Sequence, residues 1–433
     1  MVSTHQVAGS TPAGGAISSP FVAAWQTSPM RRLISFALIS LVTTLSSVAA
    51  LTSTHTPVGD QYGMQPSTSI PWGTVSTGWQ IYRFTARDRN RSDSIKPQAF
   101  LFLMSPQGER YRLATPLVRN VHVIDWSQDG RYVLTLQSAT ARSAHSSDVL
   151  TIRDLRTWSK VGRFAIADAR LTDAKEIHVS TAAFFGLGHS RVAISTSTLT
   201  YGSYGASSTN LFIADTSRGR VDFGPIFRSS DDSEVASFWP QPSGQAILTE
   251  GSTLLTPTKS GWQRRQVGTD KCFASSGWWT PTQVLEQCTL TKDNNTQLFA
   301  FDLVSGTRAP ISPQPGFMFP DDQRRDRTWA FGYDDAWQVD GRTFVSAIPT
   351  CGPGWVEVVT GTTSRQVPNS GGHIAGVAPG ALLLSVVRGE CFGGWALTRM
   401  DPMTLRQRDL ISGRTLPGKV DSLGIIERYH SLG

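Results

Sequence analysis

The stretch from Asp125 to Leu134 reads DWSQDGRYVL and joins two apolar segments through a short polar turn. Gly130, directly after Asp129, supplies the positive φ that a tight turn requires. The segment before the turn ends on an aromatic residue, Trp126, and the segment after it is almost entirely apolar. The stretch therefore predicts a β-hairpin whose second strand is buried on both faces.

The same order of residues returns further along the chain. Residues 238 to 248 read FWPQPSGQAIL, with Trp239 and Gly244 in the places of Trp126 and Gly130. Shorter copies occupy 279–285, 339–345 and 377–383. A second kind of hairpin, clearest in VLTIRDLRTWSKVGRF at 149–164, follows most copies and recurs seven times, about 40 to 60 residues apart. The predicted turns of these seven hairpins lie near Ser105, Asp154, Asp215, Thr256, Asp302, Thr360 and Asp401.

Two hairpins per repeat make one four-stranded sheet, and repetition at this interval is typical of a β-propeller. The sequence therefore predicts an all-β chain with seven four-stranded blades. Six blades is the alternative, if the hairpin at 99–113 belongs to an extension. A lone strand at 78–84 and another at 422–429 are expected to complete the first blade together, which would tie the two ends of the chain and leave no open seam.

One signature carries a family resemblance. Residues 126 to 131, Trp-Ser-Gln-Asp-Gly-Arg, resemble the W-S-x-D-G-[KR] signature of TolB-like, WD40-type propellers of the cell envelope, which also occurs in the propeller domains of some peptidases. The resemblance covers roughly residues 80 to 430. It implies association with other proteins at the propeller rim or central funnel, by analogy of fold alone.

The N-terminal region predicts export. Residues 33 to 51 read LISFALISLVTTLSSVAAL without a charge, and Arg31 and Arg32 precede them, as in a secretory signal. Small residues favour cleavage after Ala50. An uncleaved membrane anchor is the alternative, and Met30 competes with Met1 as the true start. Both interpretations place the body outside the cytoplasm, secreted or anchored, and make this segment the only membrane contact.

The expected domain organisation follows from these segments. Residues 1–50 would be a disordered N-terminus plus the signal peptide or anchor helix at 33–51. Residues 51–77, rich in Thr, Ser, Pro and Gly, are expected to be a flexible tether. Residues 78–433 would form a single propeller domain.

The four cysteines of an exported chain predict two disulfides. Cys272 and Cys288 flank a predicted hairpin at equal distances from its turn near Thr280, so they should lie opposite each other. Cys351 and Cys391 occupy matching loops, CGPGW and CFGGW, of successive blades and are expected to pair. Metal binding by the four thiolates is the weaker alternative, because the chain has no C-x-x-C pair.

The charge distribution argues against nucleic acid as a partner. The formal net charge is +7, but the basic residues are scattered, and the densest group, Arg324, Arg325 and Arg327, is interspersed with aspartates. Binding to nucleic acid would need a basic stripe. The expected partner is an envelope or extracellular protein, and the chain is expected to be a monomer.

A search for catalytic motifs finds none. The segment 188–192 lacks the final glycine of a nucleophile elbow, and no H-E-x-x-H occurs. The histidines His122, His178, His189 and His373 are isolated and are interpreted as packed or solvated. The acidic pairs Asp231-Asp232 and Asp334-Asp335 are interpreted as exposed loop charges, with calcium binding or acid–base chemistry as the alternative. The tryptophans Trp278, Trp279, Trp355 and Trp395 are interpreted as blade-core residues, with stacking on sugars or peptides as the alternative.

These observations favour a non-catalytic protein-binding or scaffold module rather than an enzyme. They assign no catalytic residue, ligand-binding residue, metal or cofactor. The alternative is a secreted propeller enzyme, of the glycan-active or lactone hydrolase/lyase type, whose acids and histidines come from separate blades and converge in the central funnel.

Overall fold

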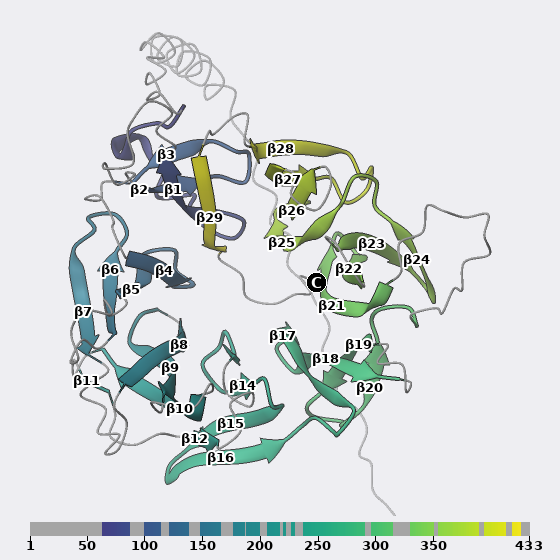
Figure 1. Ribbon diagram of the computed structural model, residues 1–433, viewed down its shortest axis with the longest axis horizontal. Helices are drawn as coiled ribbons and strands as arrows, with labels where there is room; N and C mark the ends of the chain where they lie inside the picture. The colour runs from purple at the N-terminus through teal and green to yellow at the C-terminus, as the bar shows by residue number, and fades with distance from the viewer. Residues whose placement is uncertain are drawn as a thin grey trace, which may run out of the picture. The chain divides into compact units, whose positions relative to one another are not determined.

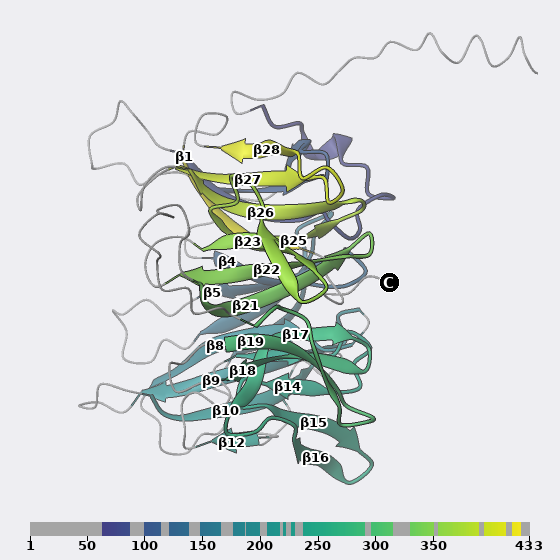
Figure 2. The ribbon, with the colours of Figure 1, turned by 90° about the vertical axis from the view of Figure 1, so that its right-hand side faces the viewer.

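The computed structural model describes residues 63–86, 99–113, 121–137, 148–165, 176–186, 188–199, 206–216, 220–221, 227–229, 237–290, 296–314, 330–349, 354–388, 394–412 and 418–425. These belong to one compact unit, Pro57–Gly433, while Met1–Thr56 forms a second unit outside the described residues. Apart from the short 3-10 helix η3 (Ser67–Ser69), all regular structure in the described part of the chain is β-strand. Seven sheets surround a central axis (Figures 1 and 2).

Each sheet is one blade, and in each of them one strand lies innermost (Figure 1). From the axis outward, blade 1 consists of β29 (Gly418–Ile425), β1 (Gln80–Ala86), β2 (Ala99–Met104) and β3 (Arg110–Arg112), and blade 2 of β4 (Val121–Trp126), β5 (Tyr132–Gln137), β6 (Val149–Asp154) and β7 (Lys160–Ala165). Blade 3 consists of β8 (Glu176–Phe184), β9 (Arg191–Leu199), β10 (Ala206–Asp215) and β11 (Arg220–Val221), with β12 (Phe227–Ser229) also paired to β10. Blade 4 consists of β13 (Phe238–Pro240), β14 (Ile247–Thr249), β15 (Thr253–Thr258) and β16 (Gly261–Gln266).

The remaining three blades follow the same plan. From the axis outward, blade 5 consists of β17 (Cys272–Thr280), β18 (Gln283–Thr289), β19 (Thr296–Asp302) and β20 (Arg308–Pro310). Blade 6 consists of β21 (Ala330–Val339), β22 (Arg342–Pro349), β23 (Trp355–Thr360) and β24 (Thr363–Gln366). Blade 7 consists of β25 (Gly372–Ala378), β26 (Ala381–Arg388), β27 (Gly394–Met400) and β28 (Gln407–Ser412). The predicted seven-bladed, all-β propeller is therefore confirmed, and the six-bladed alternative is wrong, because the hairpin at 99–113 belongs to blade 1.

The first blade joins the two ends of the chain. β29 pairs antiparallel with β1, from Gln80 opposite Ile425 to Ala86 opposite Gly418. The predicted closure is thus present, although the C-terminal strand begins at Gly418 and not at Ser422 as expected. Because β29 occupies the innermost position, the edge of β1 that would face the axis is paired.

The hydrophobic core lies between the blades. Seven apolar clusters are found, one at each contact between neighbouring blades. The alternation of side chains along each strand explains why the core lies between blades. On β2, Leu101 and Leu103 pack towards blade 2, whereas Phe102 and Met104 pack towards blade 7. Successive side chains of a strand point to opposite faces, so a continuous apolar run supplies two interfaces at once.

The signature turn after β4 is closed by its own side chains. Ser127 Oγ accepts a hydrogen bond from Tyr132 N at 2.8 Å and donates to Asp129 Oδ1 at 2.5 Å. Asp129 Oδ1 also accepts from Arg131 N, and Gly130 has the expected positive φ of 70°. The motif is therefore a self-capped turn, which explains why serine and aspartate accompany the glycine.

The described part of the segment that precedes β1 packs against blade 1. Met64 and Ile70 are buried at 2% and 6% exposure, and Gln65 exchanges backbone hydrogen bonds with Arg110 and Arg112 of β3. Of the expected tether at 51–77, residues 63–77 are thus held on the propeller; the predicted domain boundaries stay a prediction. The expected helix at 33–51 lies outside the described residues, and among those residues no helix is long and apolar enough to cross a membrane.

Candidate functional site

A pocket of about 230 Å³ opens where the innermost strands of four successive blades end. We call it the funnel pocket. Its walls come from β4, β8, β13 and β17 and from the turns after β4 and β13. The lining residues are Asp125, Trp126, Gln128, Ala183, Phe184, Trp239, Pro240, Pro242, Ser276, Gly277 and Trp278. Residues far apart in the sequence therefore meet at one place near the axis.

Aromatic residues at the strand ends build the walls. Trp126 ends β4, Phe184 ends β8, and Trp239 and Trp278 lie near the ends of β13 and β17. The indole Nε1 of Trp278 donates to the carbonyl of Trp239 at 3.0 Å and so links blades 5 and 4. A Cβ on Gly277 would lie 3.1 Å from the Trp239 ring, so glycine allows this close approach.

β-Bulges shape the strands that face the axis. Between β4 and β5 the pairing passes from Val123 opposite Thr135 to Asp125 opposite Leu134, so one residue of β4 is extra. Similar shifts occur on β8, β17, β21 and β25 and between β29 and β1. A bulge re-aims the side chains that follow it, and on β4 the residue that follows is Asp125.

The carboxyl group of Asp125 is the one acidic group among the described residues that line the pocket. Its Oδ1 accepts a hydrogen bond from Trp126 N at 2.7 Å, and its Oδ2 accepts from Phe184 N of blade 3 at 2.6 Å. Burial raises the pKa of Asp125 to about 7, although these two hydrogen bonds oppose the shift. A carboxyl group with a pKa near neutrality can give or take a proton at physiological pH.

Three side-chain polar atoms of the lining residues lack a hydrogen-bond partner within the described part of the chain. They are Trp126 Nε1, Gln128 Oε1 and Ser276 Oγ, each of them buried. Trp126 is only 5% exposed. An unsatisfied buried polar group costs about 1–3 kcal/mol, so three in one pocket call for an explanation. A bound polar molecule would satisfy them.

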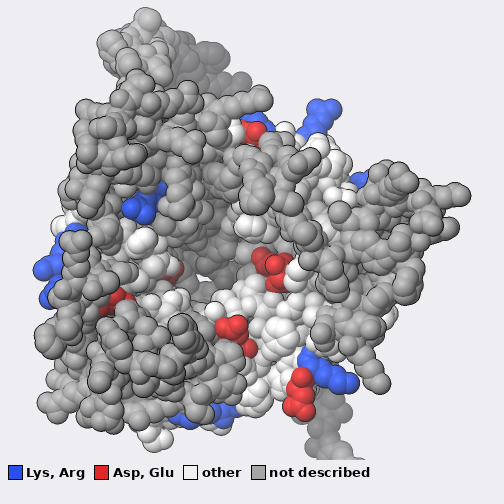
Figure 3. All heavy atoms as spheres, in the orientation of Figure 1, with Lys and Arg blue, Asp and Glu red and all other residues white. Residues whose placement is uncertain are grey.

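The acidic pair Asp334-Asp335 does not lie in a loop, which corrects the sequence-based interpretation. Both residues are on β21, the innermost strand of blade 6, at a bulge. Asp335 accepts hydrogen bonds from Ala336 N at 2.8 Å and from the indole of Trp337 at 2.7 Å. Asp334 is exposed, but partial desolvation, followed by the charge of Asp335, raises its pKa to about 6. Figure 3 shows acidic atoms on the inner wall of the central hollow.

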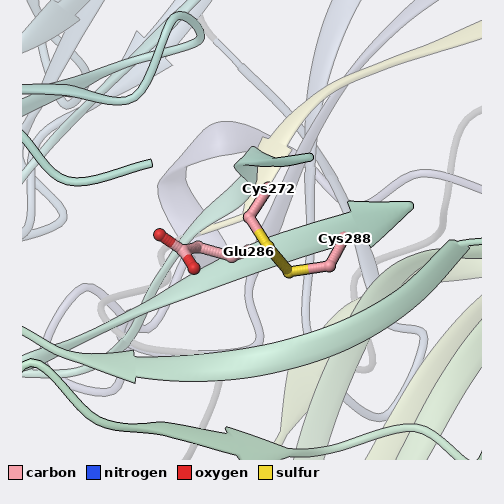
Figure 4. A group of neighbouring side chains, drawn as sticks. All are labelled: Cys272, Glu286 and Cys288. Atoms are coloured by element: carbon pink, nitrogen blue, oxygen red, sulfur yellow. A yellow bond between two sulfur atoms is a disulfide. The ribbon is translucent and has the colours of Figure 1, made fainter. Parts of the chain in front are cut away.

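The predicted disulfide between Cys272 and Cys288 is present. The two residues are directly opposite on β17 and β18, with Cα atoms 4.0 Å apart (Figure 4). Glu286 lies beside the sulfurs, and together they form the one group of three potential metal ligands in the described part of the chain. Because the sulfurs are bonded to each other and Glu286 pairs with Arg308 at 2.6 Å, this group does not hold a metal.

The histidines are not gathered into a cluster in the part of the chain that the structure describes. His122 on β4 and His373 on β25 are exposed on innermost strands. The ring of His189 packs on Tyr132, with ring centroids 3.8 Å apart. The side chain of His178 lies outside the described residues.

The tryptophans divide between core and pocket. Trp279 and Trp355 are buried in the cluster between blades 5 and 6, as expected. Trp278 packs in the cluster between blades 4 and 5 and also lines the funnel pocket. Outside the described residues or side chains lie Cys351, Cys391, Trp395, Asp231, Asp232 and the arginine group at 324–327.

Sequence reasoning assigned no ligand-binding residue and so missed the funnel pocket. The sequence places Asp125, Trp126 and Gln128 at a turn and gives no sign of a role for Ser276. The available signal was the repeated aromatic residue at the end of an innermost strand. Strands that converge on an axis bring such residues together, but the sequence does not show which blades contribute.

Comparisons with known proteins show which solved structures share this fold. A scan against protein-family models finds no match, and a search of curated protein sequences finds none either. Among solved structures 468 chains match, so the likeness is widespread and identifies an architecture. An acylaminoacyl peptidase from Pyrococcus horikoshii has a TM-score of 0.51 at 13% identity, and the match covers 78% of this chain and 51% of that one.

Two further matches show the range of the neighbours. The β-propeller domain of the Trilobed protease from Pyrococcus furiosus has a TM-score of 0.48 at 12% identity, covering 79% of this chain and 94% of that chain. TolB from Acinetobacter baumannii has a TM-score of 0.37 at 9% identity, covering 79% and 65%. The predicted likeness to TolB is thus found, as one among several propellers; a WD40-type relationship in particular is not shown.

These matches correct the functional prediction. A non-catalytic scaffold and a chain that is not an enzyme were expected, but several of the matching structures are peptidases, and a lyase is also among them. The names of these structures agree better with the alternative, an enzyme, than with a scaffold. At identities of 9–14% the likeness itself shows the fold alone.

Proposed function

We propose that this chain is a propeller enzyme whose active site is the funnel pocket and whose proton-transfer group is Asp125. The proposed reaction is attack on a small polar ring of the glycan or lactone type. The observation that carries this proposal is the enclosed carboxyl group of Asp125, which lines the same pocket as three unpartnered polar atoms.

The geometry suits general base catalysis. In its ionised form Asp125 can take a proton from a water molecule that attacks an ester carbonyl carbon, so that the ring C–O bond breaks and the leaving oxygen gains a proton. Trp126 Nε1–H and the hydroxyl of Ser276 have no hydrogen-bond partner among the described residues, and we propose them as donors to substrate oxygens. Hydrolysis of a glycosidic bond by two carboxyl groups is less well supported, because Asp125 is the only carboxyl group among the described lining residues.

Substitution of Asp125 by asparagine tests the catalytic role. We expect Asp125→Asn to lower kcat about 10²- to 10⁴-fold, the usual contribution of a general base. The wild-type rate should rise with pH through about 7, where Asp125 ionises, and then level off. Assays against a panel of neutral sugar lactones and oligosaccharides, as pH–rate profiles, measure both.

Asp148→Asn is a matched control. Asp148 is buried at 3% exposure in the same blade and also accepts a hydrogen bond from blade 3, from Val179 N at 2.8 Å, but it does not line the pocket. This variant should keep both the rate and the pH profile. A rate that is equally low in both variants, or a wild-type rate that falls as the pH rises through 7, would contradict the assignment of Asp125 as base.

We further propose that the protein is exported. The charge-free segment at 33–51 supports this, as does the disulfide between Cys272 and Cys288, since disulfides persist in oxidising compartments. The W-S-x-D-G-R signature also supports a place among the TolB-like, WD40-type propellers of the envelope. Mass spectrometry of the mature protein should find Thr52 or Leu51 near its N-terminus, whereas an intact Met1 or Met30 in the cytoplasmic fraction would contradict export.

A further inference from the structure

We infer that the funnel pocket selects a neutral, polyhydroxylated ring and discriminates against the same ring when it carries an anionic group. This inference rests on the proposed function, because it takes the funnel pocket to be the substrate site. It goes further in naming the charge and hydrogen-bonding pattern of the ligand.

Three buried atoms of the pocket wall lack a hydrogen-bond partner among the described residues, and we take them as the groups that recognise the ligand. Trp126 Nε1 can only donate, Gln128 Oε1 can only accept, and Ser276 Oγ can do either. The amide nitrogen of Gln128 already donates to the carbonyl of Pro242 at 2.9 Å, which fixes the amide so that Oε1 is the free atom. A hydroxyl group both donates and accepts, so a ring with several hydroxyls can satisfy all three atoms.

The walls give the ligand flat apolar surfaces. Phe184, Trp239 and Trp278 line the pocket beside Trp126. Aromatic rings with one polar edge bind molecules that have both apolar faces and polar edges. A sugar ring presents C–H groups on its faces and hydroxyls at its edge, which matches this arrangement.

The charge of the pocket opposes anions. Among its described lining residues none is lysine, arginine or histidine, and the one ionisable group is Asp125. Carboxylates and phosphates are bound in proteins by arginine, lysine or clustered backbone N–H groups. Here the backbone N–H groups of Trp126 and Phe184 are already bonded to Asp125. An anionic ligand would therefore lose its hydration without gaining a cationic partner.

The size of the pocket limits the ligand to about one ring. Its volume of about 230 Å³ equals that of roughly eight water molecules at ~30 Å³ each. Drug-sized ligands occupy sites of about 300–1,000 Å³, so an oligosaccharide would place only one unit in the pocket. The substrate class is thus a single neutral sugar or sugar lactone, or the end unit of a neutral glycan.

Titration calorimetry with three related probes tests the inference. The probes are D-glucose, D-glucuronate and D-glucose 6-phosphate, which share one ring and differ in charge. We expect glucose to bind at least about tenfold more tightly than either anion at pH 8, where Asp125 is ionised. Equal or tighter binding of the anions would overturn the inference, as would no binding of any of the three.

Two pairs of variants test which atoms recognise the ligand. Trp126→Phe and Ser276→Ala each remove one free donor and should weaken glucose binding about 3- to 10-fold. Trp158→Phe is the control for the first, because Trp158 lies in the same hydrophobic cluster but not in the pocket. Ser275→Ala is the control for the second, because Ser275 donates to the carbonyl of Asp334 instead. Both controls should bind like the wild type; if all four variants bind alike, these atoms do not recognise the ligand.

The binding and rate measurements separate the two proposals. If glucose binds with the expected preference but no lactone or glycan is turned over, the pocket selects neutral rings and the catalytic role of Asp125 is wrong. If turnover depends on Asp125 but anionic rings are preferred, the enzyme proposal holds and the inference on charge is wrong.

Discussion

Gly244 and Gly341 occupy equivalent turns after innermost strands and share a φ of 72°. Their surroundings differ. A Cβ on Gly244 would lie 2.6 Å from the Cα of Gly186 in the neighbouring blade, whereas a Cβ on Gly341 meets nothing within 4 Å. The same residue type therefore serves the turn alone in blade 6 but serves both the turn and the contact between blades in blade 4.

Alanine substitutions separate these two roles. Gly341→Ala should lower the free energy of unfolding by about 1–2 kcal/mol, the cost of a left-handed backbone for a residue with a Cβ. Gly244→Ala should lower the free energy of unfolding by about 1–3 kcal/mol more, because the backbones of blades 3 and 4 must also move apart. Urea unfolding measures both; equal losses would show that the close approach to Gly186 relaxes freely.

At the scale of the element, the innermost strands combine pairing with irregularity. Each innermost strand pairs with the next strand of its blade, yet most of them contain a β-bulge. β17 departs furthest, since Ala274 is opposite Glu286 and the next pair along the strands is Trp278 opposite Val284. This departure brings Ser276 and Gly277 to the pocket, and the disulfide at the start of β17 holds the strand on β18.

Removal of this disulfide should weaken the protein as a whole. The bridge spans a sequence separation of 16 residues, and closing a loop of that length stabilises by about 3 kcal/mol in the chain-entropy model. The double variant Cys272→Ala, Cys288→Ala should therefore unfold at a lower urea concentration. Addition of reductant should lower the urea midpoint of the wild type by a similar amount. The variant has no Cys272–Cys288 bridge to reduce, so it should not show this loss.

The other cysteine pair provides a comparison for that experiment. The predicted bridge between Cys351 and Cys391 lies outside the described residues, and non-reducing peptide mapping tests it directly. A double variant of Cys272 and Cys288 that is as stable as the wild type would show that β17 is held by its ladder and by blade contacts alone.

At the scale of the whole molecule, stability depends on ring closure. Each blade shares one hydrophobic cluster with each neighbour, and among the described residues no blade has a separate core of its own. The two ends of the chain meet in blade 1, where β29 pairs with β1. The contact between blades 7 and 1 is apolar and includes Tyr82, Phe84 and Leu383. Loss of β29 would thus expose the edge of β1 in a ring whose other contacts depend on closure.

Truncation tests this dependence. A chain that ends at Pro417 lacks β29 and should unfold at much lower urea concentration, with a broader transition and a tendency to aggregate through the exposed edge of β1. A chain that ends at Ile425 keeps all of β29 and is the matched control. Identical unfolding curves for the two chains would show that closure by β29 is not needed for stability.

The architecture of this protein can be predicted from its sequence. The repeated hairpins, the glycines of the turns and the runs of apolar residues predict seven four-stranded blades, and the equal distances of Cys272 and Cys288 from one turn predict their pairing. These features depend on contacts that are local in the chain, or that repeat from blade to blade. Local propensity and alternation therefore suffice to read them.

The composition of the site depends on the tertiary structure. Ser276 shares no motif with Asp125 and Gln128, and the three meet because blades 2 and 5 converge at the axis while bulges turn individual residues towards it. The raised pKa of Asp125 likewise comes from enclosure by other blades, since its own neighbours in sequence form an ordinary turn. Burial is a property of the closed ring, so neither the position nor the protonation of this carboxyl group can be read from the residues on either side of it.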